Sequence, residues 1–287
     1  MLSLREQLIL KGCRENCEDG LIFNSNYAVV MDGATGLNKH NVTGYGTDAQ
    51  WLTLRTLEIL STKLKESSTS IVDILKITAE TLRSEYRYLW SLSGLNIQDI
   101  EYPSAGIIIV REVGDKIQIY RLGDCLGVIR TTEGIEVLKD TELLKLDRQV
   151  HNTLVKVSKE KGITISESRY TEEVIEVLKF NRSLKNTDNG YWIYDPEAEG
   201  INNGEYLELD RESIKSIYIM TDGLSNAIDV YKMYETEIDL VNDIDKLRLH
   251  RVVNKLTDVQ DSDANCSKFI RTKKMDDTTA IVIDIVK

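Results

Sequence analysis

The chain of 287 residues has few of the residues that interrupt secondary structure, form disulfides or bind zinc: it contains two prolines, four cysteines and three histidines. No linker rich in Pro, Gly or Ser and no internal repeat interrupts it, so residues 1–287 are predicted to form a single domain. Cys13 and Cys17 are separated by three residues, and Cys125 and Cys266 are isolated. This spacing does not indicate a disulfide framework, and it favours free or structural thiols over a zinc site.

Long apolar runs are also missing. No uncharged run reaches the roughly 18 residues of a membrane span, and the N-terminal residues lack the charged head and apolar stretch of a signal peptide. Asp and Glu outnumber Lys and Arg by 47 to 36, which gives a net charge of −11. Such a surface repels phosphate backbones. We therefore expect a cytoplasmic monomer with no membrane or nucleic-acid partner, and read the basic residues 271–274 as solvated surface.

Two apolar runs end in the same dipeptide. Residues 27–31 lead into Asp32-Gly33, and residues 216–221 lead into Asp222-Gly223. Each run has the composition of a buried strand whose last residue carries a carboxylate out of the core. A strand end is a rigid place to hold a charged group, so both aspartates are candidate metal ligands.

The apolar periodicity predicts an α+β protein in which helices cover antiparallel sheets, because hairpin-connected strands alternate with pairs of helices. Asp48 is predicted to cap the first helix. Helices are expected over residues 48–64, 71–89, 142–158, 171–184 and 225–257, and strands over 105–111, 117–122, 125–131, 135–138, 206–209, 217–221 and the C-terminal segment. Residues 258–274 are polar and are expected to be mobile.

The irregular residues 186–204 carry Tyr191, Trp192 and Tyr194. A long loop with aromatic residues in a compact domain is often a lid or a substrate-binding loop. It can equally be a loop that its aromatic side chains pin to the core. We name the three residues as a candidate substrate loop and leave both interpretations open.

Six acidic residues stand at predicted strand edges: Glu18, Asp19, Asp32, Asp124, Asp222 and Asp276. If they converge, they cannot all be ionised without a counter-charge, because neighbouring carboxylates raise one another's pKa. A divalent cation removes this conflict. Ligands that are all oxygen, with no histidine or cysteine pattern among them, select Mg²⁺, Mn²⁺ or Ca²⁺, and the chain has no EF-hand loop.

Five motifs in order resemble those of the PP2C (PPM) family of metal-dependent serine/threonine protein phosphatases, especially its bacterial members. Each motif is weak alone, but together they cover nearly the whole chain. The motifs are Arg14-Glu15-Asn16-Cys17-Glu18-Asp19, Asp32-Gly33-Ala34-Thr35-Gly36, Gly123-Asp124-Cys125-Leu126, Thr221-Asp222-Gly223-Leu224 and Asp276-Asp277-Thr278-Thr279.

The resemblance implies a four-layer αββα fold, a sandwich of two antiparallel β-sheets flanked by α-helices, with two Mg²⁺ or Mn²⁺ ions in a cleft at one end. It implies that a water bridging the ions becomes hydroxide near neutral pH and attacks phosphorus. The roles that it implies are Asp32 as the bridging ligand, the Gly33 carbonyl on one ion, Asp222 and Asp276 on the other, Glu18 binding through water with support from Asp19, Asp124 at a third ion, and Arg14 on the substrate phosphate.

The chain departs from the family pattern in places. Cys17 replaces an asparagine, and Cys125 and Leu126 replace Ser-Arg. Ala34 stands where many eukaryotic members have a histidine thought to protonate the leaving group, so the general acid is unassigned. His40 is either a substitute for it or a loop residue. His151 and His250 lie in predicted helices and are interpreted as structural.

The favoured function is hydrolysis of phosphoserine and phosphothreonine in proteins. One alternative is a pseudophosphatase that binds a partner through the cleft. The chain keeps all the main metal acids, which argues against it, since a binding module has no need of mutually repelling carboxylates. The other alternative is a phosphatase for a small phosphorylated metabolite, enclosed by the aromatic loop.

Overall fold

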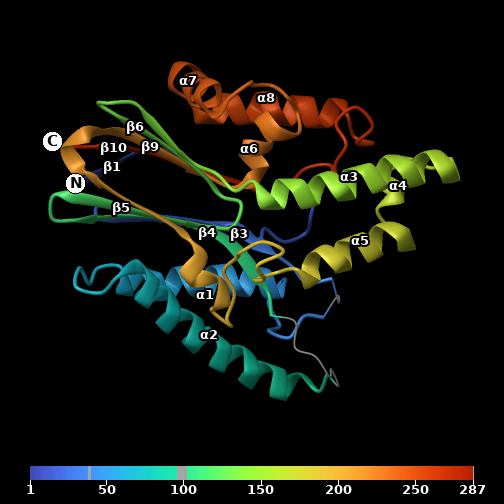
Figure 1. Ribbon diagram of the computed structural model, residues 1–287, viewed down its shortest axis with the longest axis horizontal. Helices are drawn as coiled ribbons and strands as arrows, with labels where there is room; N and C mark the ends of the chain where they lie inside the picture. The colour runs from blue at the N-terminus through green and yellow to red at the C-terminus, as the bar shows by residue number, and fades with distance from the viewer. Residues whose placement is uncertain (38–39, 96–101, 287) are drawn as a thin grey trace.

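Two five-stranded antiparallel sheets pack face to face in the computed structural model, which describes residues 1–37, 40–95 and 102–286 (Figure 1). The first sheet has the order β1-β10-β9-β6-β7, and the second has the order β2-β3-β4-β5-β8. The strands are β1 (Leu2–Leu10), β2 (Gly20–Asn24), β3 (Tyr27–Ala34), β4 (Ser104–Val113), β5 (Lys116–Leu122), β6 (Leu126–Thr131), β7 (Ile135–Leu138), β8 (Glu205–Asp210), β9 (Ile214–Met220) and β10 (Thr278–Ile285).

Strand β3 is apolar on both faces because helices cover one face and the other sheet covers the opposite face. Tyr27, Val29 and Met31 pack in the cluster beneath the helices, whereas Ala28 and Val30 belong to the cluster between the sheets. All five side chains are at most 3% exposed. This alternation decides which way each residue at the end of the strand points.

Helices form the two outer layers, so the predicted α+β sandwich is confirmed (Figure 1). The helices α1 (Asp48–Lys63) and α2 (Ile71–Ser93) cover the second sheet, and α6 (Asp222–Asp229), α7 (Glu237–Leu247) and α8 (Leu249–Ser262) cover the first. The helices α3 (Glu142–Lys161), α4 (Ile165–Ser168) and α5 (Glu172–Ser183) lie together at the end of the sandwich opposite the termini. Short 3₁₀ turns, η1 (Glu199–Asn203) and η2 (Arg211–Ser213), flank β8.

The predicted cap of α1 is wrong by one residue. The hydroxyl of Thr47 accepts the backbone N–H of Gln50 at 3.0 Å, which makes Thr47 the N-cap. The buried Asp48 carboxylate instead accepts the N–H of Val42 at 3.0 Å and the hydroxyl of Tyr86 at 2.9 Å. Both residue types favour helix starts, so the sequence alone does not separate them.

The expectation of a mobile polar segment at residues 258–274 is also wrong. Helix α8 takes in its first part, and a buried ion pair joins Asp263 to Arg271 at 2.6 Å, with side chains 3% and 7% exposed. Asp263 also accepts the backbone N–H groups of Lys268 and Phe269. These contacts fix a loop that looks unstructured by composition.

We expect Asp263→Ala to lower the free energy of unfolding by about 3–5 kcal/mol, because it leaves the buried Arg271 guanidinium unpaired. The matched control is Lys274→Ala, which breaks the exposed pair with Asp261 and should change stability by less than about 1 kcal/mol. Urea unfolding measures both. Equal small effects would mean that the pair does not hold the loop.

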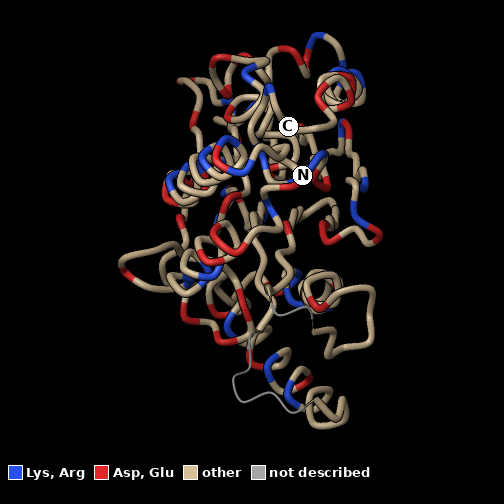
Figure 2. Tube along the Cα trace, turned by 90° about the vertical axis from the view of Figure 1, so that its right-hand side faces the viewer, with Lys and Arg blue, Asp and Glu red and all other residues tan. Residues whose placement is uncertain are grey.

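Basic and acidic residues are interspersed along the chain in Figure 2, with no face of one sign in that view. The absence of a nucleic-acid partner remains a prediction. Within residues 1–37, 40–95 and 102–286, no helix combines the length and apolarity that crossing a bilayer requires.

Candidate metal centre

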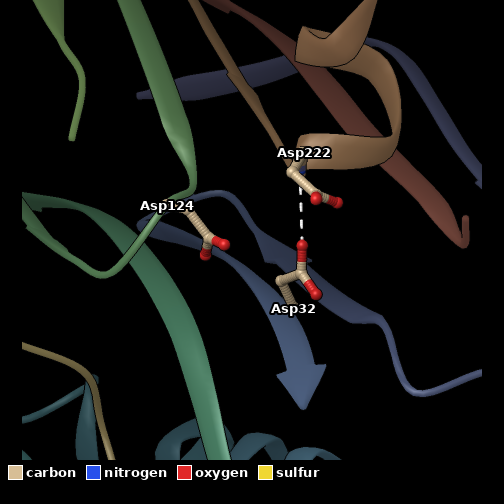
Figure 3. A group of neighbouring side chains, drawn as sticks. All are labelled: Asp32, Asp124 and Asp222. Atoms are coloured by element: carbon tan, nitrogen blue, oxygen red, sulfur yellow. Dashed lines mark hydrogen bonds between the residues drawn. The ribbon is translucent and has the colours of Figure 1, made fainter. Parts of the chain in front are cut away.

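Three aspartates from different parts of the chain meet at one end of the sandwich. Asp32 lies near the end of β3, Asp124 follows β5 and Asp222 begins α6. Figure 3 shows their side chains pointing into one space, and one carboxylate oxygen from each lies within 4.8 Å of the others. The backbone N–H of Asp222 donates to Asp32 Oδ2 at 3.4 Å.

The strand alternation explains the position of Asp32. The side-chain period of two puts Asp32 on the same face as Ala28 and Val30, which is the face between the sheets. Asp124 comes next to Gly123, whose φ of +85° suits a glycine in the turn between β5 and β6. The carboxylates thus gather where the apolar layer between the sheets ends.

The glycines of the two Asp-Gly pairs allow close packing of the chain. A Cβ atom at Gly33 would lie 2.5 Å from the carbonyl oxygen of Glu18, and one at Gly223 would lie 1.9 Å from that of Asp277. A second segment therefore crosses each Asp-Gly pair, and this accounts for the repeated dipeptide. The role of the Gly33 carbonyl as a metal ligand remains a prediction.

Glu18 lies beside the cluster with both carboxylate oxygens engaged. Arg14 Nη1 donates to Glu18 Oε2 at 2.6 Å, and the Thr35 hydroxyl donates to Glu18 Oε1. The Glu18 side chain is 3% exposed, whereas that of Arg14 is 35% exposed. The Arg14 side chain is therefore partly open to solvent, although its partner Glu18 is buried.

Asp277 and Thr221 position the neighbouring acids. The Asp277 carboxylate accepts the backbone N–H of Gly12 at 2.8 Å and that of Glu18 at 2.7 Å. The Thr221 hydroxyl donates to Asp19 Oδ2 at 2.8 Å. Asp19 is thus held in place by a hydrogen bond from the residue that precedes Asp222.

A cavity of about 230 Å³ opens beside Asp124 and Asp222, and Asp276 also lines it. Lys273 Nζ lies 2.6 Å from each carboxylate oxygen of Asp276. All six predicted acids therefore lie at or around this end of the sandwich. Three of them, Asp32, Asp124 and Asp222, form the closest group.

The electrostatics of the centre favour a cation. Burial, and next the charge of Asp222, raise the pKa of Asp32 well above its ordinary value. Burial is also the main cause that raises the pKa of Asp222 to about 7 and that of Asp124 to about 6. Burial likewise raises the pKa of Asp19. Oxygen ligands this close suit a hard divalent ion such as Mg²⁺ or Mn²⁺.

Two members of the candidate substrate loop pack against the core. Tyr194 is fully buried, and its backbone pairs with that of Ala105 at 2.8 and 3.1 Å. Trp192 packs against the same core cluster. Tyr191 alone reaches a hollow, one of about 180 Å³ that adjoins Asp124 between α3 and α5. Trp192 and Tyr194 thus fix this part of the loop to the core, and a role of the loop in substrate binding remains a prediction.

Three residues of the cavity were missed or misread in the sequence. Asp147 and His151 lie one turn apart on α3 and line the cavity, as does Lys273. Burial and the charge of Asp222 raise the pKa of Asp147 to about 7, and burial lowers the pKa of His151. In the sequence they belong to the polar face of a helix and to a polar loop, which carry no signal of a site. His40 is not among the residues that line these cavities.

A family model described as protein phosphatase 2C matches residues 15–261. The fold is similar to that of the serine/threonine phosphatase PstP/Ppp of Mycobacterium tuberculosis, with a TM-score of 0.57 and 11% identity over 100% of this chain and 99% of that one. A structure of the PstP catalytic domain in complex with two manganese ions has a TM-score of 0.56 and 12% identity, with full coverage of both chains.

A curated relative matches only a part of the chain. A stretch of 104 residues is 26% identical to a glycine–tRNA ligase of Chlamydia trachomatis. It spans 36% of this chain and 10% of the length of the ligase. No activity follows from so partial a match.

Proposed function

The chain belongs to the protein phosphatase 2C family of phosphoprotein hydrolases, and we propose that it removes phosphate from phosphoserine and phosphothreonine with the help of two Mg²⁺ or Mn²⁺ ions. The observation that carries the proposal is the convergence of Asp32, Asp124 and Asp222 within 4.8 Å. We propose residues 1–287 as one catalytic domain.

The residues present fit such ions, because Asp32, Asp124 and Asp222 are crowded, partly buried carboxylates with raised pKa values, and no Lys or Arg that the structure describes forms an ion pair with them. When bound, the ions would activate a water molecule between them for attack on phosphorus and offset the negative charge of the transferring group. The chain contributes ligands held on rigid elements. In this proposal Asp32 would hold both ions, the Gly33 carbonyl, Asp222 and Asp276 would complete their ligands, Glu18 and Asp19 would act through water and hydrogen bonds, and Asp124 would serve a third, weaker position.

Arg14 is proposed to bind the substrate phosphate. Its guanidinium has five N–H donors, and the bond to Glu18 leaves others available at the rim. Glu18 is in turn positioned through its backbone by Asp277. The pair therefore holds the guanidinium in a defined direction before substrate arrives, which lowers the entropy lost on binding.

We favour a protein substrate over a small metabolite because two aromatic residues of the candidate substrate loop pack against the core. Trp192 and Tyr194 pack into the core and do not close over the cavity. The hollow of about 180 Å³ next to Asp124 has an apolar wall that includes Leu146, Leu178 and Tyr191. It offers space for the residues that flank a phosphorylated side chain.

We expect phosphate release from phosphoserine and phosphothreonine peptides in Mn²⁺ or Mg²⁺, and a fall to background in EDTA, because the carboxylates alone supply no nucleophile. The assay compares these peptides with p-nitrophenyl phosphate and with small phosphorylated metabolites. Readdition of Mn²⁺ after EDTA is the control for irreversible damage. Turnover that persists in EDTA would contradict the proposal. Faster turnover of metabolites than of peptides would favour the metabolite alternative.

A further inference from the structure

One cation of the protein already occupies a proposed metal ligand. Lys273 Nζ lies 2.6 Å from both oxygens of Asp276, and their side chains are 22% and 27% exposed. Both residues line the cavity of about 230 Å³ together with Asp222. An ion that binds Asp276 must therefore contend with an ammonium group at its ligand atoms.

Two other basic groups near the centre have partners other than Asp276. Arg271 also lines the cavity, but its guanidinium is held by the Asp263 carboxylate and by the Phe269 carbonyl at 2.7 Å. Arg14 is paired with Glu18. Among the residues described by the structure that line the cavity, Lys273 is thus the cation placed on a candidate ligand.

The loop around Lys273 allows the side chain to move while the backbone stays in place. Arg271 Nε donates to the carbonyl of Lys274 at 3.1 Å, which anchors the backbone on both sides of Lys273. A lysine stem has four flexible carbons and ends in a point charge that accepts many geometries. The ammonium can therefore leave Asp276 without a change of fold.

The acids of the centre are not equally available to an ion. No Lys or Arg of the described ranges forms an ion pair with Asp32, Asp124 or Asp222, whereas Asp276 is paired with Lys273. A first divalent ion at Asp32, Asp124 and Asp222 is attracted by all three carboxylates and removes the repulsion between them. An ion at Asp276 meets a like charge in contact, and like charges in contact are strongly unfavourable.

We propose that Lys273 is an exchangeable cation at Asp276: it neutralises this carboxylate in the metal-free protein, is displaced when a divalent ion binds there, and then binds the substrate phosphate in the cavity. The inference rests on the proposed function, since it takes Asp276 as a ligand and a phosphate ester as the substrate. It predicts that the ion at Asp276 binds with the lower affinity of the two. It also makes Lys273, in addition to Arg14, a cationic group that binds the phosphate.

Calorimetric titration of the metal-free full chain with Mn²⁺ tests the first half. Lys273→Gln should bind the weaker Mn²⁺ about tenfold more tightly than the wild type, because the competing charge is gone. Lys273→Arg keeps the charge and should stay near the wild-type affinity. Lys274→Gln, which removes the neighbouring lysine paired with Asp261, is the matched control and should also leave it unchanged.

Binding of inorganic phosphate to the Mn²⁺-saturated proteins tests the second half. Lys273→Gln should bind phosphate about tenfold more weakly than the wild type, with Lys274→Gln unchanged. Mn²⁺ affinity that is equal or lower in Lys273→Gln, in a protein that melts as the wild type does, overturns the competition. Unchanged phosphate affinity overturns the phosphate contact. A wild type that binds no Mn²⁺ contradicts the proposed function itself, which is a separate result.

Discussion

Asp32→Asn is expected to lower kcat on a phosphopeptide by about 10³-fold or more and, in EDTA, to make the protein more stable than the wild type. The loss follows if the ligand shared by both ions is removed, since metal ions supply several kcal/mol of transition-state stabilisation. The gain follows because the asparagine carries no charge at a site where burial and Asp222 already raise the pKa of the carboxyl.

The variant is informative because it is expected to lower activity and to raise stability. A substitution that merely damages the fold lowers activity and stability together. We expect the free energy of unfolding in EDTA to rise by roughly 2 kcal/mol. The variant removes a charge that lies close to other carboxylates in the folded state and far from them in the unfolded state. Urea unfolding gives the stability and phosphate release gives the activity.

The matched control is Asp115→Asn, which makes the same chemical change in the exposed turn between β4 and β5. Asn suits such a turn as well as Asp does, so both measurements should stay at wild-type values. If Asp32→Asn were less stable than the wild type in EDTA, the carboxylates would not be in conflict. The case for an ion at this place would then lose its physical basis.

The sequence was informative where function coincides with strand ends. Asp32 and Asp222 each follow an apolar run, and the strand period fixes the direction of a residue once the core face is known. The layers of the fold were predictable for the same reason, because hairpin-connected strands and amphipathic helices leave few arrangements. The sequence pattern does not show which distant segments pack against each other. The contact of Gly223 with Asp277, for example, depends on the pairing of β9 with β10.

The residues that were missed share a different property. Asp147 and His151 stand on the polar face of a helix in the sequence, and Lys273 is a lysine in a polar loop. Nothing local distinguishes them from solvated residues, since their position at the cavity is set by how α3 and the loop pack. The aromatic residues of the loop show the opposite ambiguity: an aromatic residue in a polar loop suits a lid and a core contact equally, and the tertiary fold buries Tyr194 completely.

Stability in EDTA should fall as the pH rises from 5 to 7, and saturating Mn²⁺ should remove or reverse this fall. The pKa of Asp222 is raised to about 7 and that of Asp124 to about 6 in the folded protein, against 3.8 for the ordinary carboxyl. Between these limits the folded state binds more protons than the unfolded state. The free energy of unfolding therefore decreases with pH in this window.

The contribution of Asp222 can be isolated by comparison with Asp222→Asn. Carboxyls with lowered pKa values, such as Asp263 and Asp243, add a stability that is lost only below this window, and His151 acts in the opposite direction in both proteins. The difference between the two curves should grow from pH 5 to 7 in favour of the variant, to about 2–4 kcal/mol, and then level off. Coupling with Asp276 and Asp124 makes the upper value a limit.

Mn²⁺ reverses the pH dependence of the free energy of unfolding because it binds the carboxylates only after their protons have left. The stabilisation that a ligand gives grows with its affinity, and this affinity rises with pH until the acids are ionised. The wild type should therefore become the more stable protein in Mn²⁺ at pH 8, although it is the less stable one in EDTA. Parallel pH curves for wild type and Asp222→Asn, with and without Mn²⁺, would show that Asp222 neither carries a raised pKa nor holds an ion. The crossover would show that one physical conflict, carboxylates crowded at the end of an apolar layer, both weakens the metal-free fold and creates the site.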